Sequence, residues 1–428
     1  MSAGPSKKID ATKSGVVRAA GSVWLLLVFL LLIWNTARGG FASLLYTYAA
    51  GTNQIAAADA AVKLAPNDAE AHFLRAAILE ANSDLPAAIA EYEKAAQLRP
   101  DDYVLWLALA RARELNGELD QALAAAREAV PLAPFYAQPR WQLGNLLVRA
   151  GQREEGFKEL RLAAASDPTL LPAIIDLAWQ LSGGDVNAVK QAIQPRSAES
   201  YKALAEYLKK HGEVAEATQM FGLAGSDAEV LRAREQYINE LISAKRFKEA
   251  YELWSIGRGL SSSNALGAMV DPGFEQESNL DEPGFGWRSE NKALTVTLSL
   301  ETANPKEGKS SLRVEFSGDS APATPIISQL VLVEPNNRYQ LHFAARTESI
   351  VSGGLPRVAV VDAGNQEILG QTNAFPETAN NWQDYTIDFN SKETTSAIRI
   401  SLQRESCSKS PCPIFGRLWL DNFSFLKL

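Results

Sequence analysis

The hydrophobic pattern near the N-terminus predicts a helix that spans a membrane. Residues 19–37 carry no charged side chain, and as a helix they would extend roughly 28 Å, close to the hydrocarbon thickness of a bilayer. Trp24 and Trp34 bracket the most apolar part of this run, as aromatic residues do at membrane interfaces. The alternatives are a cleaved export signal, for which bulky neighbours make Ala37 a poor cleavage site, and a buried core helix. An uncleaved anchor fits the pattern best.

Basic residues on the two sides of this helix predict its orientation. Residues 1–18 form a basic tail, whereas Arg38 alone follows the apolar run closely. Because Lys and Arg are enriched in cytoplasmic flanks, we expect the tail to be cytoplasmic and the bulk of the chain to be periplasmic or extracellular. The basic residues of the tail are Lys7, Lys8, Lys13 and Arg18.

A helical pattern with a period of 34 residues follows the anchor. The segments 69–102, 103–136 and 137–170 align without a gap, and each predicts two helices joined by a turn. The eighth position is small in every copy, so that the first helix can press against the second, and glycine occupies the turn in two copies. Each unit ends at a proline, which cannot continue a helix. The residues concerned are Ala76, Ala110 and Gly144; Gly117 and Gly151; and Pro100, Pro134 and Pro168.

These repeats resemble the tetratricopeptide repeat, which implies an all-α solenoid. Weaker copies extend the pattern over 41–260, with a first helix beginning near Phe41 and an interrupted unit at 171–197. The resemblance implies an inner groove that binds a partner protein, with aromatic side chains for apolar groups and Arg or Asn for a carboxylate or backbone. The alternative is a solvated inner face without a ligand. The candidate groove residues are Phe73, Leu107, Arg111, Trp141, Asn145 and Arg149.

The helical period stops where the composition changes to Gly and Ser, at 257–273. We therefore predict a linker at 261–269 and a separate domain at 270–428. That domain contains eight short runs in which apolar and polar residues alternate, which predicts an all-β sandwich. The runs are 294–300, 310–316, 326–333, 338–346, 357–362, 382–389, 397–404 and 417–426.

The order of motifs in this domain resembles the jelly-roll carbohydrate-binding modules of xylanases and glucanases. The matching pieces include "DPGFE" at 271–275, "GFGW" at 284–287, "EGKSSLRV" at 307–314 and "GRLWLDNFSF" at 416–425. The resemblance implies a concave sheet face that binds a polysaccharide, and a structural Ca²⁺ held by Glu275 and Asp421. A purely structural or protein-contacting sandwich is the alternative.

Alternation along the strands selects the candidate glycan-binding residues. It leaves His342 and Arg346 outward on one strand and Arg399 and Gln403 outward on another, with Gln329 beside them if these strands share a sheet. Because no outward Trp or Tyr is obvious, we expect a loop phenylalanine to stack on the sugar. The candidates are Phe285, Gln329, His342, Arg346, Phe375, Arg399 and Gln403.

Charge and missing motifs exclude other classes of function. The net charge of −8 and the pI of about 5.2 disfavour a nucleic-acid partner, which requires a basic surface. The three histidines form no H-E-x-x-H, and neither G-x-S-x-G nor G-x-G-x-x-G occurs, so we predict that the chain is not an enzyme. The alternative, a hydrolase without these motifs, would need a catalytic acid such as Asp281 or Glu282.

The two cysteines lie close together in "CSKSPC". Outside the cytoplasm, Cys407 and Cys412 can form a disulfide that closes a small loop, which we favour over two free thiols.

The predicted fold class is multidomain: one transmembrane helix, an all-α tetratricopeptide-repeat solenoid and an all-β jelly-roll sandwich. The predicted function is a non-catalytic, membrane-anchored scaffold for partner proteins, with surface polysaccharide synthesis or export as its suggested setting. The alternative is a cell-envelope adhesion or glycan-binding protein in which the repeats are a spacer. Both interpretations of function rest on fold analogy.

Overall fold

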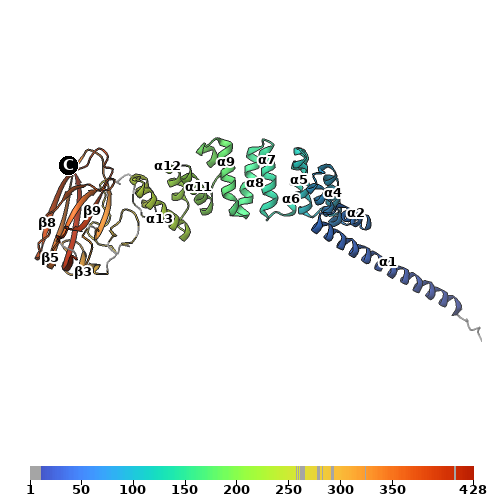
Figure 1. Ribbon diagram of the computed structural model, residues 1–428, viewed down its shortest axis with the longest axis horizontal. Helices are drawn as coiled ribbons and strands as arrows, with labels where there is room; N and C mark the ends of the chain where they lie inside the picture. The colour runs from blue at the N-terminus through green and yellow to red at the C-terminus, as the bar shows by residue number, and fades with distance from the viewer. Residues whose placement is uncertain are drawn as a thin grey trace, which may run out of the picture. The chain divides into compact units, whose positions relative to one another are not determined.

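The computed structural model describes residues 11–428 except 257, 259, 261–265, 277–279, 282, 291–293, 323 and 409–410, and it describes side chains from residue 24 onward. Most of the predicted basic tail, the first part of the predicted linker, and Glu282 therefore lie outside the described residues. The chain divides into two compact units between Gln194 and Pro195. The described elements confirm the predicted fold class, with an apolar N-terminal helix, a helical-repeat region and a β-sandwich (Figure 1).

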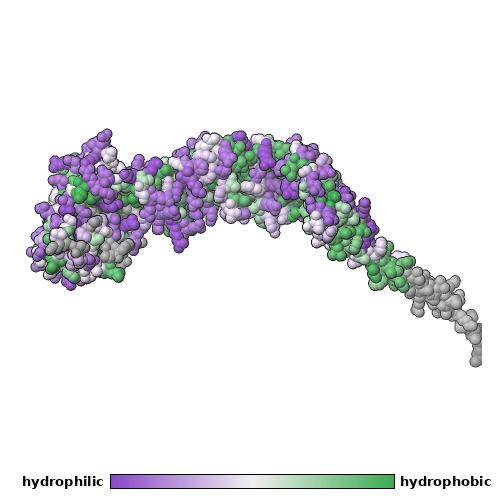
Figure 2. All heavy atoms as spheres, viewed as in Figure 1, coloured by the Kyte–Doolittle hydropathy of each residue, from purple (hydrophilic) through white to green (hydrophobic). Residues whose placement is uncertain are grey.

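The first helix of unit 1, α1 (Ala11–Thr52), is continuous through the point where the predicted membrane segment ends. The expectation of a separate repeat helix beginning near Phe41 was therefore wrong, because Gly39 and Gly40 keep the helical backbone. Residues 24–52 are long and apolar enough to cross a membrane, and Figure 2 shows the apolar surface of this exposed helix. Arg38 donates hydrogen bonds to the carbonyls of Lys63 and Leu64, at the end of the second helix.

Unit 1 continues as a series of antiparallel helix pairs (Figure 1). Short turns join the two helices of each pair, and neighbouring pairs pack against each other. The helices are α2 (Ile55–Leu64), α3 (Ala69–Ala81), α4 (Leu85–Leu98), α5 (Tyr103–Leu115), α6 (Leu119–Leu132), α7 (Ala137–Arg149), α8 (Arg153–Ser166), the 3₁₀ helix η1 (Pro168–Leu170), α9 (Leu171–Ser182) and α10 (Val186–Ile193).

Small side chains allow the two helices of each pair to pack closely, as the eighth repeat position predicts. Ala76 and Ala110 are fully buried. A Cβ atom added to Gly144 would lie 2.7 Å from Leu160 Cγ, so any side chain there would force Leu160 or the neighbouring helix to shift.

The starts of α3 and α5 are fixed by aspartate caps. The Asp68 carboxylate accepts a hydrogen bond from the Glu70 amide at 3.1 Å, and Asp102 accepts one from the Val104 amide at 3.0 Å. Such caps satisfy backbone amides that have no partner within the helix. The cap is thus repeated after 34 residues in these two units, whereas Tyr136 at the start of α7 makes no such bond.

Unit 2 begins with four further helices, α11 (Ala198–Lys210), α12 (Val214–Leu223), α13 (Ala228–Ser243) and α14 (Phe247–Ser255). Aromatic contacts join α14 to the segment that leads into the sandwich: the Phe285 ring centroid lies 5.0 Å from that of Tyr251 and 5.8 Å from that of Trp254. The division at Gln194 and Pro195 thus differs from the composition change at 257–273, where we expected a boundary.

The rest of unit 2 is a sandwich of two five-stranded antiparallel sheets. Sheet A has the order β1-β4-β9-β6-β7, and sheet B has the order β2-β3-β10-β5-β8. The structure adds two short strands, β1 and β7, to the eight that alternation predicts. The strands are β1 (Arg288–Ser289), β2 (Val296–Glu301), β3 (Ser311–Asp319), β4 (Ile327–Leu332), β5 (Arg338–Ser352), β6 (Pro356–Asp362), β7 (Ile368–Gln371), β8 (Ala379–Asn390), β9 (Ala397–Arg404) and β10 (Pro413–Lys427).

The core of the sandwich lies between the two sheets. Leu341 and Phe343 of β5 contribute to it from sheet B, and Ile398 and Ile400 of β9 contribute from sheet A. The intervening residues of these strands therefore point to the outer faces.

Candidate functional site

The predicted groove residues lie on α3, α5 and α7, the first helices of three successive pairs. Ion pairs connect these helices: Arg111 Nη2 lies 3.0 Å from Glu80 Oε2, and Arg149 pairs with Glu114. The side chains that face each other across the helices therefore share one surface. We call it the inner helix face, and define it as Phe73, Glu80, Arg111, Glu114, Trp141, Asn145 and Arg149.

Two arginines are the most accessible groups of the inner helix face. The Arg111 side chain is 57% exposed, and that of Arg149 is 67% exposed. A guanidinium group carries five N–H donors, so one ion pair leaves donors that can bind a second acceptor. Exposed ion pairs contribute only about 0–1 kcal/mol to stability, so a carboxylate from a partner can compete with Glu80 or Glu114.

A buried tyrosine supports the start of this face. The Tyr92 hydroxyl donates a hydrogen bond to Glu80 Oε2 at 2.9 Å, and the Tyr92 ring lies 5.7 Å from that of Phe73. Burial raises the pKa of Tyr92, and the hydrogen bond to Glu80 raises it further, so the phenol stays protonated. Glu80 is thus held between Tyr92 and Arg111.

The structure corrects the groove prediction at Leu107. This side chain is buried within the repeats and cannot line an accessible groove.

The Asn145 amide donates to the Trp141 carbonyl at 2.8 Å and is therefore engaged by its own helix. Trp141 and Phe73 are half-buried, which leaves part of each ring available for contact.

A hollow of about 390 Å³ lies elsewhere in unit 1, between α8, α9 and α10. Its lining mixes apolar and charged side chains, including Phe157, Arg161 and Leu181. It forms where the repeat is interrupted, because α10 has only eight residues. The sequence indicates that interruption, but not the hollow.

The predicted glycan-binding residues do not share one face. His342 and Arg346 lie on β5 in sheet B, whereas Arg399 and Gln403 lie on β9 in sheet A. The expectation of a single face was wrong, because alternation shows which side of a strand a residue occupies but not which strands pair.

Gln329 is also placed differently from the prediction. It shares the inner side of β4 with Ile327 and Val331, which belong to the core. Its side-chain amide donates to the Val270 carbonyl at 2.8 Å, and its oxygen accepts from the Val270 amide at 3.2 Å. Gln329 therefore joins the opening segment to the sheet and cannot contact a ligand outside it.

Neither predicted stacking phenylalanine is accessible. Phe285 is 1% exposed and packs against Tyr251 and Trp254 of α14. Phe375 is fully buried, and its ring centroid lies 4.9 Å from that of Tyr385. The assumption that a loop phenylalanine is exposed was wrong, because both loops fold onto packed aromatic clusters.

On sheet B, Arg346 and His342 are engaged by their neighbours. The Arg346 guanidinium carbon lies 3.9 Å from the ring centroid of Trp419 and 5.4 Å from that of Trp382. Burial lowers the pKa of Arg346. His342 contacts Gln340 at 2.6 Å and Thr386 at 2.9 Å through its two ring nitrogens.

Polar side chains, including two arginines, lie on the outer face of sheet A. Arg399, Ser401 and Gln403 alternate outward along β9, and Arg357 of β6 lies in register with Gln403. The Arg399 guanidinium lies 3.9 Å from the Glu290 carboxylate, and that of Arg357 lies 3.6 Å from the Glu405 carboxylate. Within the described residues, the buried Ser401 hydroxyl has no hydrogen-bond partner. Arg399, Gln403 and Arg357, but not the buried Ser401, therefore give this face donors and acceptors of the kind that sugar hydroxyls bind.

The two predicted calcium ligands approach the same loop. Asp421 is fully buried and accepts hydrogen bonds from the amides of Lys306 at 2.8 Å and Glu307 at 3.2 Å, while Glu275 accepts from the Lys309 amide. Burial raises the pKa of Asp421; the backbone hydrogen bonds lower it, and the charge of Glu275 raises it. Two hard carboxylates so arranged fit Ca²⁺ chemically, although the described residues include no cluster of three His, Cys, Asp or Glu side chains.

Comparison with known proteins gave no matching family model and no matching curated protein. Among solved structures, MamA is 18% identical, with a match that covers 37% of this chain and 89% of MamA at a TM-score of 0.31. YrrB, a TPR protein with an unusual peptide-binding site, is 18% identical over 46% of this chain and 90% of YrrB, with a TM-score of 0.29. TmCBM61, solved with β-1,4-galactotriose, is 19% identical over 37% of this chain and 97% of its own, with a TM-score of 0.26.

Proposed function

We propose that this protein is a non-catalytic scaffold, anchored in a membrane by α1, whose inner helix face binds a segment of a partner protein. The partner segment would supply a carboxylate and an apolar side chain. In this proposal the repeats and the sandwich lie outside the cytoplasm, and the partners belong to machinery that makes or exports a surface polysaccharide.

The exposed arginine pair carries this proposal. Arg111 and Arg149 come from adjacent first helices, and each is more than half exposed while holding only one ion pair on the inner helix face. Charge-assisted hydrogen bonds from guanidinium to carboxylate are strong and directional. The half-buried rings of Phe73 and Trp141 on the same face provide apolar contact.

In-cell crosslinking with the full chain and its anchor tests the proposal. The double variant Arg111→Glu, Arg149→Glu should reduce the crosslinked partner at least about tenfold, since each lost charged hydrogen bond is worth about 1.5–3 kcal/mol. The control is Arg127→Glu on α6, which removes an arginine of similar exposure outside the inner helix face. Recovery of the same partners at unchanged yield from the double variant would contradict the proposal.

A second candidate function is glycan binding by the sandwich, with the repeats as a spacer. The outer face of sheet A favours it, because Arg399, Gln403 and Arg357 place polar side chains on one surface. In sheet B the corresponding polar groups already bind one another.

Glycan-array binding by the full chain distinguishes the two sheets. Arg399→Ala with Gln403→Ala should abolish binding, whereas His342→Ala on sheet B should leave it unchanged. Loss of binding in the His342 variant alone would place the glycan on the opposite sheet, and no binding by the parent chain would remove this candidate.

We also propose that Glu275 and Asp421 hold a structural Ca²⁺. Both carboxylates bind the loop at 306–309, so an ion between them would fix this loop and the start and end of the sandwich together.

A further inference from the structure

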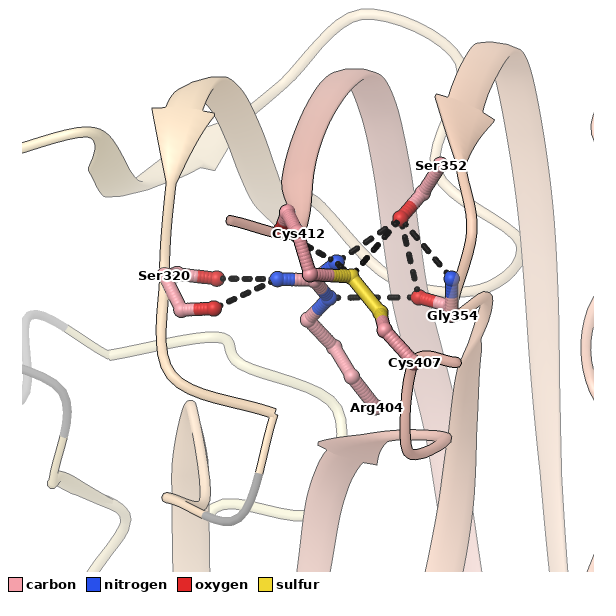
Figure 3. The surroundings of a disulfide bond; sticks show 6 residues. All are labelled: Ser320, Ser352, Gly354, Arg404, Cys407 and Cys412. Atoms are coloured by element: carbon pink, nitrogen blue, oxygen red, sulfur yellow. Dashed lines mark hydrogen bonds between the residues drawn. A yellow bond between two sulfur atoms is a disulfide. The ribbon is translucent and has the colours of Figure 1, made fainter. Parts of the chain in front are cut away.

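A buried arginine lies at one end of the sandwich, beneath the disulfide (Figure 3). Arg404, the last residue of β9, is only 3% exposed. Its guanidinium donates to the Ser320 carbonyl at 2.6 Å, the Ser352 hydroxyl at 2.7 Å, the Gly354 carbonyl at 3.2 Å and the Cys412 carbonyl at 2.9 Å. It thus joins segments from both sheets.

The same guanidinium contacts the disulfide sulfur. Arg404 Nη2 lies 2.9 Å from Cys412 Sγ and 3.9 Å from Cys407 Sγ. Every hydrogen-bond acceptor of Arg404 within the described residues is neutral. Burial lowers the pKa of Arg404, and the negative charge of Asp319, which does not accept a hydrogen bond from it, raises that pKa. A buried cation without a bound anion is unfavourable, so an anion formed on Cys412 would be stabilised directly.

The two sulfur-bearing residues differ in access. Cys412 is 8% exposed and lies against Arg404, whereas Cys407 is half-buried in a loop whose neighbours Ser406 and Ser408 are exposed. An external thiolate can therefore reach Cys407 more readily. Thiol–disulfide exchange is fastest at an accessible sulfur whose partner is a good leaving group.

We propose that Cys407–Cys412 is a thiol-exchange site: an external dithiol attacks Cys407, and Cys412 leaves as a thiolate that Arg404 holds. The proposal is independent of peptide or glycan binding.

The exchange balances with a dithiol as the reductant. A thiolate of the dithiol bonds to Cys407 Sγ, the bond to Cys412 Sγ breaks, and its electron pair stays on Cys412 as a thiolate beside Arg404. The second thiol of the reagent, as its thiolate, then attacks its own sulfur in the mixed disulfide and releases the Cys407 thiolate, which takes a proton from water. The dithiol is oxidised to a cyclic disulfide, and the protein disulfide is reduced by two electrons.

Arg404 should favour the reduced state over the disulfide, because the guanidinium stabilises a thiolate more than a neutral sulfur. Reduction would remove the covalent link between Cys407 and Cys412 while leaving β9 and β10 paired with their neighbours through the backbone.

The first test measures Cys412 in the full-length variant Cys407→Ser. Its alkylation rate by iodoacetamide, followed against pH by mass spectrometry, should give a pKa below about 7, compared with about 8.5 for an unperturbed thiol. Adding Arg417→Gln, which removes an arginine of β10 that pairs with Glu315 and Glu348, should leave this value unchanged. A Cys412 pKa of 8.5 or higher would overturn the proposal.

The second test equilibrates the full chain with reduced and oxidised dithiothreitol. Arg404→Gln should make the disulfide about tenfold harder to reduce, equivalent to about 30 mV, and Arg404→Lys should recover part of the effect. Equal equilibrium constants in correctly folded parent and Arg404→Gln proteins would overturn the proposal. Since Arg404 also has structural contacts, the Cys407→Ser measurement decides the matter if these variants fail to fold.

Discussion

At the scale of single residues, one turn position shows a clear mismatch between residue type and backbone. Gly117 and Gly151 adopt positive φ angles of 80° and 79° in successive helix pairs, and Ser83 occupies the equivalent place with φ of 64°. Glycine adopts this conformation freely, whereas a side chain makes it unfavourable by about 1–2 kcal/mol. The first complete repeat therefore contains strain that its neighbours lack.

We predict that Ser83→Gly stabilises this helix pair by about 0.5–1 kcal/mol, because the relief of strain exceeds the added flexibility of the unfolded chain. Hydrogen exchange of the amides in α3 and α4 should slow by about two- to fivefold. The reverse change, Gly117→Ser, should speed exchange in α5 and α6. Unchanged or faster exchange in Ser83→Gly would contradict the prediction.

Sequence reasoning predicted the residues whose position follows from the repeat itself. Ala76, Ala110 and Gly144 are small because the partner helix of the same hairpin lies against them. The burial of Leu107 and of Phe285 was not predicted, and the side chains that cover Phe285 come from outside its local pattern. Phe285, for example, is covered by Tyr251 and Trp254 of α14.

At the scale of elements, strand positions followed from alternation but strand partners did not. All eight predicted strands occur, yet β5 and β9 belong to different sheets, which separates His342 from Arg399. Backbone pairing is a long-range property, since strands of similar pattern can join either layer of a sandwich. The loop at 306–309 is a further example, because it brings Glu275 to the same place as Asp421.

We predict that EDTA lowers the melting temperature of the sandwich and that added Ca²⁺ restores it, because the ion would neutralise two carboxylates at one loop. Asp421→Asn should abolish the response to Ca²⁺. Asp384→Asn is the matched control, since Asp384 pairs with the Lys306 ammonium at 2.9 Å but is exposed and distant in the sequence from the proposed ligands. An identical melting temperature with and without EDTA would remove the calcium proposal.

At the scale of the whole molecule, the order of the three kinds of structure could be predicted from composition and period alone. The division into compact units could not, since it falls between Gln194 and Pro195 while the composition changes after residue 256. The contacts of Trp254 with Phe285 associate the last helices with the sandwich, and no local pattern in the sequence encodes them.

We predict that a reporter enzyme fused after Leu428 is active only outside the cytoplasm, because the charges that flank the apolar run at 19–37 favour a cytoplasmic N-terminus. Alkaline phosphatase should be active in the fusion and a cytoplasm-dependent reporter inactive. Reversing the flanking charges, by replacing Lys13 and Arg18 with Glu and adding lysines beside Arg38, should shift the balance. Activity of the parent fusion restricted to the cytoplasm would contradict this topology.

The unbroken path of α1 has a mechanical consequence for how such a protein would work. In the proposed anchor, α1 runs without a break from its apolar turns to the turn of Arg38, which donates a hydrogen bond to the end of α2, so the first hairpin would follow the tilt of α1. Bilayer thickness would then control the angle at which that hairpin emerges, and a few flexible glycine residues inserted after Ala37 would uncouple the two.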